Sequence, residues 1–350
     1  MFRNPSMGPR GGYQPARAFD ATGASGQAFL ESQLELINPK MIEPLQGITH
    51  TRDLPMKYGG GFPQFTSAFA TNYGSTGSQL SGLQGTSNTE IPLVQADVQK
   101  GVWDVYDWAA SMAIKYLDLQ RLETASRNGQ PPPISLQKLY EDSCKVLWNK
   151  DLDRMAYKGF LNRPGLLNNT NAPETTVPQG STTYTTWLKK SFPEILADVN
   201  FGTNAILANS GYDGVNAVPD RLLVPYEQFG YISAPATLGG VGAGFNSIQS
   251  YIEHECIAAK LLRAEGKEFK IYPLPDPWIS GIGAGSPPSD RGCLYRNDEN
   301  CLLLWVPQVM TKGFTVPTDK NGGSWVSIWY GAIGQINFYR TSTMIYLDAI

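Results

Sequence analysis

The stretch Ser135–Gly159, SLQKLYEDSCKVLWNKDLDRMAYKG, decides how the rest of the chain is interpreted, because it is the clearest long helix in the sequence. Its apolar residues recur mostly at intervals of three or four positions, which places them on one side of a helix. Pro131–Pro133 exclude helix just upstream, Ser135 suits an N-cap, and Gly159 suits a left-handed C-cap. We therefore predict a helix of about 24 residues and roughly 36 Å, which is long for a globular domain.

The apolar side of this helix is expected to be core. The predicted core positions are Leu136, Leu139, Tyr140, Leu147 and Met155. An aspartate at Leu147 is expected to abolish folding, because it would place a charge in that core. The other segments are interpreted as packing on this helix or extending from it.

The composition describes a folded chain with an unusually uncharged surface. Of 350 residues, 41% are hydrophobic and 17% are charged, and the formal net charge is −3. A typical domain has about 25% charged residues, so much of this surface is uncharged, as in surfaces buried against other copies. The length suggests about two domains, and the slight negative charge excludes a basic nucleic-acid-binding domain.

The cysteines and the N-terminus indicate a reduced, cytoplasmic protein. Cys144, Cys256, Cys293 and Cys301 lack the spacing of a disulfide framework or a zinc site. The N-terminus lacks the apolar core of a signal peptide, and no apolar run reaches the roughly 18 residues of a membrane span. We therefore expect no membrane partner.

Residues 1–49 are predicted to form an N-terminal arm. Arg3, Arg10 and Arg17 lie among Gly, Pro, Ser and Gln, and such a segment buries too little surface to fold alone. We expect either a solvated tail or an arm that becomes ordered against a neighbour. Contact of the three arginines with nucleic acid is a further open alternative.

Residues 50–102 are predicted to form an extended two-stranded arm. From Tyr58 to Thr89 no side chain is charged, and Thr89–Tyr106 returns as a strand-like run. Aromatic residues that a flexible linker would not need are spread through the first half, at Tyr58, Phe62, Phe65, Phe69 and Tyr73. A lone hairpin is unstable in water, so these aromatics are expected to contact a partner; the alternative is a low-complexity loop.

The remaining residues divide into a domain around the long helix, at 103–188, a small α/β domain, at 189–294, and a β-rich end, at 295–350. In the α/β domain, helices over Lys189–Ser210 and Ser247–Gly266 alternate with strands over Pro219–Pro225 and Phe269–Leu274. The β-rich end is expected to return to the domain of the long helix, which would make the α/β domain an insertion. Its strands are predicted at Cys301–Val306, Trp325–Tyr339 and Thr343–Leu347.

Candidate catalytic residues are scarce. His254-Glu255-Cys256 lacks the second histidine of a zinc-binding HExxH motif, and positions 254 and 256 point apart on a helix. The glycine-rich segments 239–244 and 281–285 lack the lysine and the acidic residue that nucleotide sites need. We predict no catalytic residue, no metal and no cofactor. An α/β enzyme with active-site loops at 236–246 and 281–290 is kept as an alternative.

The order of these parts resembles the major capsid proteins of tailed bacteriophages, which have the α+β HK97-type fold. The resemblance is carried by the long helix running into Gly165-Leu166-Leu167-Asn168, by Val102–Leu119 and by Pro219–Pro225. It implies that 1–49 is the N-terminal arm, that 50–102 is the E-loop, that 103–188 is the P domain with its spine helix at 135–159, and that 189–294 is the A domain. Residues 295–350 would then return to the P domain.

The resemblance also implies a function. The chain is expected to be a head protein that self-assembles through pentamers and hexamers into an icosahedral shell around a phage genome. Implied partners are other copies, separate scaffolding, portal and cement proteins, and DNA held on the inner face without sequence specificity. The implied location is the virion capsid, assembled in the host cytoplasm.

Two departures from the family and two alternatives belong with this resemblance. Only about fifty residues precede the E-loop, which implies a separate scaffolding protein or none. The lysine and asparagine that crosslink some members have no match here. The alternatives are the shell of an encapsulin-like nanocompartment and, less compatible with the long helix, an adhesin or tail protein.

Overall fold

The computed structural model describes residues 47–76, 93–127, 136–211, 216–234, 247–284, 288–317 and 323–350. The chain divides into two compact units, and the larger one comprises residues 46–121 and 136–350. Everything below concerns that larger unit, except the end of α3 (Tyr116–Arg127), which belongs to the other. The predicted N-terminal arm lies outside the described residues up to position 46. Among the described helices, none has the length and the hydropathy of a membrane span.

A five-stranded sheet forms the centre of the α/β part of the chain. Its strand order is β4-β12-β7-β5-β6. The strands are β4 (Glu174–Thr176), β12 (Met344–Asp348), β7 (Arg291–Tyr295), β5 (Arg221–Pro225) and β6 (Lys270–Leu274). β5 and β6 are parallel, whereas β7 is antiparallel to both of its neighbours. Every residue of β7 and β12 is buried, as expected of strands covered on both faces.

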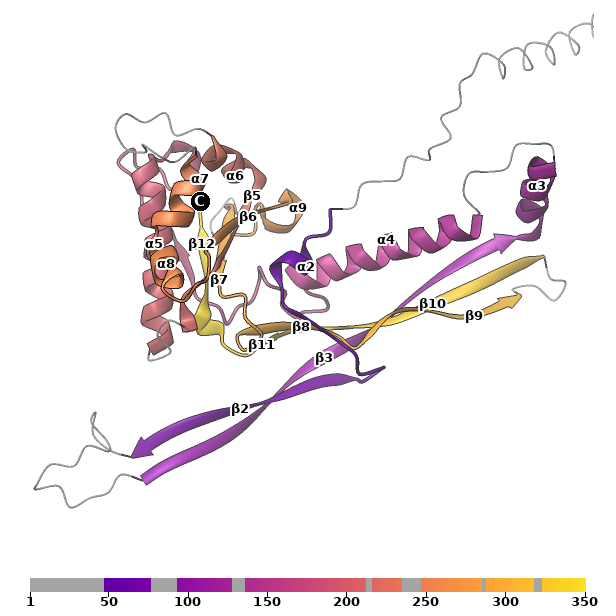
Figure 1. Ribbon diagram of the computed structural model, residues 1–350, viewed down its shortest axis with the longest axis horizontal. Helices are drawn as coiled ribbons and strands as arrows, with labels where there is room; N and C mark the ends of the chain where they lie inside the picture. Colours follow the sequence, from indigo (N-terminus) through magenta and orange to yellow (C-terminus); the bar gives the residue numbers. More distant parts are fainter. Residues whose placement is uncertain are drawn as a thin grey trace, which may run out of the picture. The chain divides into compact units, whose positions relative to one another are not determined.

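Helices cover this sheet and complete its core (Figure 1). They are α5 (Phe192–Ser210), α6 (Tyr226–Ser233), α7 (Ile248–Glu255), α8 (Ile257–Arg263) and α9 (Asp276–Ile279), with short 3-10 turns η1 (Trp187–Lys189) and η3 (Thr341–Thr343). α5 begins with a capping box in which Ser191 and Glu194 satisfy each other's backbone groups. The single helix predicted over Ser247–Gly266 is two helices, because Cys256 is extended and caps the start of α8.

The long strand β3 (Leu93–Lys115) connects two different pairings. Its first half pairs antiparallel with β2 (Phe65–Thr76), and its second half pairs antiparallel with β10 (Ser324–Gly334). β9 (Gln308–Pro317) lies on the other edge of β10. The β2–β3 ladder, defined here as Phe65–Thr76 with Leu93–Asp104, therefore continues beyond the end of β10 (Figure 1).

The predicted long helix is α4 (Leu136–Tyr157), and it packs on β3 and β10. Trp148 meets Trp108 edge to face with ring centroids 5.0 Å apart, and Cys144 packs with Met112 and Trp329. Leu152 and Met155 continue the buried side. Below the helix, a small sheet has the order β1 (Met56–Tyr58), β8 (Leu302–Val306), β11 (Ile336–Phe338). The short helix α2 (His50–Asp53) lies against α4.

Two of the predicted core positions of α4 are wrong for this subunit. Leu139 and Leu147 are 42% and 46% exposed, whereas Met155 is buried and Tyr140 is half-buried. The side that meets the sheet is set by Cys144, Trp148, Leu152 and Met155, whose steps of four, four and three follow one helical stripe. The backbone of Leu136 begins the helix.

The strands of the β-rich end do not all join the domain of the long helix. β8 to β11 join the sheets beside α4, whereas β12 pairs with β4 and β7 in the α/β sheet. Alternate residues of β12 enter different cores, with Ile345 and Leu347 on one side and Met344 and Tyr346 on the other. A strand buried on both faces belongs in the middle of a covered sheet, so the α/β part is completed by the end of the chain.

Candidate assembly surfaces

The β2–β3 ladder exposes an apolar face. Phe65 and Phe69 alternate along β2, and Val102 and Val98 alternate along β3. Because directly opposed residues of antiparallel strands share a face, all four side chains point the same way. Their exposed fractions lie between 54% for Val102 and 70% for Phe69. The ammonium group of Lys100 lies 6.0 Å from the centre of the Phe69 ring. Asp104, opposite Phe65, shares the face at its base, so the exposed apolar side chains lie there with one cation and one carboxylate.

The base of the ladder is fixed to the body of the subunit. Thr66 is buried and donates a 3.3 Å hydrogen bond to Asn337. The backbone N–H of Gln335 donates to Asp104, and the Trp103 ring meets Tyr339 edge to face. Beyond this base, the described residues of the ladder pair only with each other. The ladder is thus anchored at one end, and beyond that base most of the side chains whose burial the structure describes are exposed.

The structure separates the five aromatic residues predicted as contacts. Phe65 and Phe69 share the ladder face, and the backbone of Tyr73 pairs with Ala96 further along. Phe62 precedes β2 and is exposed, whereas Tyr58 belongs to β1 and pairs with Val306 of β8. Gly59–Gly61 connect β1 to β2 with φ angles of 104°, 130° and 77°, which side chains other than glycine rarely adopt.

A buried polar cluster joins the segment before β1 to α4. His50 Nδ1 lies 2.6 Å from Asp153, and the backbone N–H of His50 donates to the same carboxylate. The Tyr157 hydroxyl donates to the Asp53 carboxylate at 2.6 Å, and the Tyr295 hydroxyl donates to the Asp53 carbonyl. Burial, with the Asp53 carboxylate alongside, raises the pKa of Tyr157 well above its usual value. Sequence reasoning gave no role to His50, whose partner is distant in the chain.

The residues weighed for catalysis have structural partners. His254 is exposed, and its Nδ1 lies 3.0 Å from Arg263. Cys256 is buried, and burial raises the pKa of its thiol to about 11, so it is protonated near neutral pH. Within the described residues, no group of three or more His, Cys, Asp or Glu side chains is arranged to hold a metal ion. The loop 236–246 and residues 285–287 lie outside the described part of the chain.

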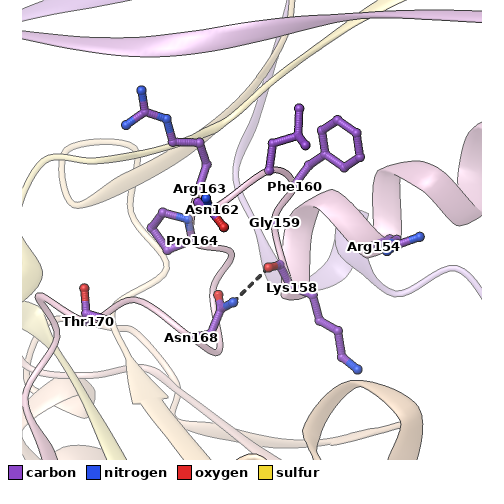
Figure 2. A pocket seen from close by; sticks show the side chains of 10 residues that line it. Arg154, Lys158, Gly159, Phe160, Asn162, Arg163, Pro164, Asn168 and Thr170 are labelled. Carbon is purple, nitrogen blue, oxygen red and sulfur yellow. Dashed lines mark hydrogen bonds between the residues drawn. The ribbon is translucent and has the colours of Figure 1, made fainter.

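A tight turn follows α4 and borders a hollow of about 480 Å³ (Figure 2). Asn168 holds the turn, since its side chain accepts from Gly165 N and donates to the Lys158 carbonyl. A Cβ on Gly165 would meet the Tyr157 carbonyl group at 2.5 Å, which explains why glycine opens the sequence GLLN. Leu166 and Leu167 are fully buried.

Comparison with known proteins agrees with these features. The major capsid protein family matches residues 81–350 of the chain. A search among curated proteins found no match. Among solved structures, the chain is similar to the capsid of Myoviridae phage XM1, with a TM-score of 0.65, 11% identity, and coverage of 91% of this chain and 98% of that one.

Two further structures show the same fold. One is from Mycobacterium phage Bobi, with a TM-score of 0.53, 12% identity, and coverage of 90% of this chain and 94% of that one. The other is the capsid of cyanophage P-SCSP1u, with a TM-score of 0.51, 10% identity, and coverage of 90% and 92%. The family match over most of the chain, with this shared fold, identifies it: the chain belongs to the major capsid protein family, has the HK97-type fold and forms capsid shells of phage virions.

Proposed function

We propose that this chain assembles through pentamers and hexamers into an icosahedral shell around a phage genome, and that the β2–β3 ladder is a principal contact between subunits. The observation that carries the proposal is the exposed face formed by Phe65, Phe69, Val98 and Val102. A two-stranded ladder without a core gains little stability by itself. A neighbouring subunit that covers this face supplies the missing core.

The energetics favour assembly through many modest contacts. Complete burial of a phenylalanine or valine side chain contributes about 1.5–3 kcal/mol. The ladder face therefore offers several kcal/mol per subunit, from which the cost of immobilising the partners is subtracted. In a closed shell each subunit both gives and receives such a contact, so the contacts reinforce one another.

The finer parts of the proposal follow from the family and from the surface. The N-terminal arm reaches further subunits, and separate scaffolding, portal and cement proteins act with the shell. Assembly takes place in the host cytoplasm, and the chain carries out no catalysis. The predicted boundaries of the E-loop, P domain and A domain belong to this proposal, with β12 assigned to the A-domain sheet.

The test is to shorten the ladder without changing its register. Removing Ser67–Gly74 together with Gln95–Val102 deletes eight opposed pairs and leaves Thr66 opposite Trp103. An even number of pairs preserves which face each remaining side chain occupies. We expect this variant to fold as a soluble subunit that forms no closed shells by negative-stain electron microscopy and light scattering.

The wild-type chain, expressed with the same tag and in the same bacterial host, is the control. It should give closed shells or regular pentameric and hexameric rings, with a candidate scaffolding protein added if it is needed. Intact shells from the shortened variant would refute the role of the ladder. Absence of any shell or ring from the wild type, with and without the scaffold, would refute the proposed assembly.

A further inference from the structure

The exposed side of α4 changes character along its length. The residues that face solvent at intervals of three or four are Leu139, Ser143, Leu147, Lys150, Arg154 and Lys158. The first half of this stripe is uncharged, and the last three positions are all cations. We call Lys150, Arg154 and Lys158 the basic row; at four residues per step they are spaced about 6 Å apart along the helix.

The acidic side chains of this part of α4 form no ion pair with the row. Asp151 accepts a 2.8 Å hydrogen bond from the Trp108 indole N–H, and Asp153 is buried against His50. Among the described residues, no ion pair within 4.0 Å involves a member of the row. The N-terminal half of the helix differs, since Lys145 pairs there with Asp142 and Glu141 pairs with Lys312. The positive charge is therefore concentrated at one end of the exposed side.

Two hollows border the row, and they differ: the one beside the turn has no acid in its lining, whereas a smaller one brings Arg154 together with Asp107 and Asp151. The hollow beside the turn is lined by Arg154, Lys158 and Arg163, by the neutral hydrogen-bonding side chains of Asn162, Asn168 and Thr170, and by no acid. Figure 2 shows Arg154 and Lys158 extending from the helix on the side away from Arg163. Arg163 pairs with Asp104 at 2.6 Å, so its charge is already neutralised. Lys158 lies 5.8 Å from the Trp278 ring, which carries no charge.

The sheet of β3, β10 and β9 has α4 on one face, and its opposite face is mainly apolar. Opposed residues on that face are Val326 and Ala113, Ile328 and Ser111, and Tyr330 and Ala109. β9 adds the exposed side chains of Phe314 and Val316. The exposed charges of β3 on that face are one acid and one base, Asp107 and Lys115, near opposite ends of its pairing with β10. One side of this sheet is thus mainly apolar, and the other side carries exposed cations that form no ion pair within the described part of the chain.

We propose that the basic row contacts the phosphate backbone of the nucleic acid that the shell encloses, which makes the α4 side of the subunit the inner face of the shell. The inference rests on the proposed function. Flexible, exposed cations without a shaped apolar groove suit sequence-independent contact with phosphates. Every subunit presents the same row, so a closed shell would present a repeated lattice of cations to the polyanion inside.

The direct test is the salt dependence of DNA binding by unassembled full-length subunits. The probe is a 30-base-pair duplex, and the variant is Lys150→Gln with Arg154→Gln and Lys158→Gln. Each phosphate contact contributes about 0.9 to the slope of log affinity against log salt concentration. We expect the triple variant to lose up to about 2.7 of this slope, and Lys150→Gln alone to lose up to about 0.9.

A matched variant controls for net charge. Lys189→Gln with Lys260→Gln and Lys267→Gln removes the same charge from exposed positions of the α/β part. It should keep the wild-type slope, and both triple variants should still form shells of normal size. Failure of assembly in the wild type would count against the proposed function, whereas normal shells with altered DNA binding concern the row alone.

Three outcomes would overturn the inference. One is an unchanged slope in the row variant, and another is an equal loss in the control. The third is a row variant that binds DNA normally but loses binding of polyglutamate, which would assign an acidic polypeptide to the row. The inner-face assignment has its own readout: Lys150 and Lys158 should react with a bulky amine reagent in free subunits and be protected in closed shells.

Discussion

The five-stranded α/β sheet and the β2–β3 ladder are opposite cases of the same secondary structure. In the sheet, every residue of β7 and β12 is buried, and each buried charge described there has a partner, such as Arg291 with Asp348 and Lys190 with Asp198. In the ladder, Phe69 is 70% exposed and the strands pair only with each other beyond their base. The sheet is completed within the subunit, whereas we propose that a neighbouring subunit completes the ladder. Substitutions in the sheet should therefore act on folding, and substitutions in the ladder on assembly.

The helix α4 carries both a buried and an exposed surface, and an aspartate substitution on each side distinguishes them. Leu152 is 4% exposed, so Leu152→Asp should lower the free energy of unfolding by more than about 4 kcal/mol or prevent folding. Leu147→Asp, five residues earlier on the exposed side, should change the free energy of unfolding by less than about 0.5 kcal/mol. Urea denaturation of the two variants measures both effects. Comparable losses would show that the exposed side of α4 is core after all.

Within the sheet, Arg291 should be the next most sensitive position. Its guanidinium group donates to Asp348, to the Leu167 carbonyl and to Glu174. Arg291→Ala leaves the Asp348 carboxylate buried without a counter-charge, so we expect a loss of about 3–5 kcal/mol in urea denaturation. Glu174→Gln is the control, because its side chain is 59% exposed and its pair with Arg291 should contribute less than about 1 kcal/mol.

The smallest effect concerns the start of α5 at low pH. Hydrogen bonds, first from the backbone N–H of Ser181 and then from Ser191, lower the pKa of Glu194 from 4.5 to about 2. A carboxylate whose pKa is lowered by folding stabilises the fold at pH values above its pKa in the unfolded state. It loses that effect as the pH falls toward its pKa in the folded state. Between pH 4.5 and 2, the unfolding free energy of Glu194→Gln should therefore fall less steeply than that of the wild type. Parallel curves in that range would show that these bonds contribute nothing.

Local patterns in the sequence predict the regular elements well. The apolar period and the flanking caps locate α4 to within two residues at each end, and the short buried strand predicted over Pro219–Pro225 is β5 (Arg221–Pro225). The absence of charge among the aromatics of the arm correctly predicts extended strands with exposed Phe65 and Phe69. Both signals depend only on neighbouring residues.

Features that depend on distant partners could not be predicted from the sequence. Leu147 and Trp148 are both apolar, and only the position of Trp108 on β3 decides which of them is buried. β12 joins β4 and β7 because of packing across the α/β core, and nothing in its own five residues specifies those strands. The pair between His50 and Asp153 joins positions 103 residues apart. The basic row can be recognised only once the structure shows that Asp153 bonds to His50 and Asp151 bonds to Trp108.

The measurement that most directly tests whether neighbours complete the ladder is thiol labelling of Phe69→Cys in free subunits and in assembled shells. The four native cysteines are buried, so the introduced thiol is the reactive one. We predict rapid labelling in the subunit, where this position is exposed, and strong protection in the shell. Equal labelling rates in both states would contradict a contact between the ladder face and a neighbouring subunit.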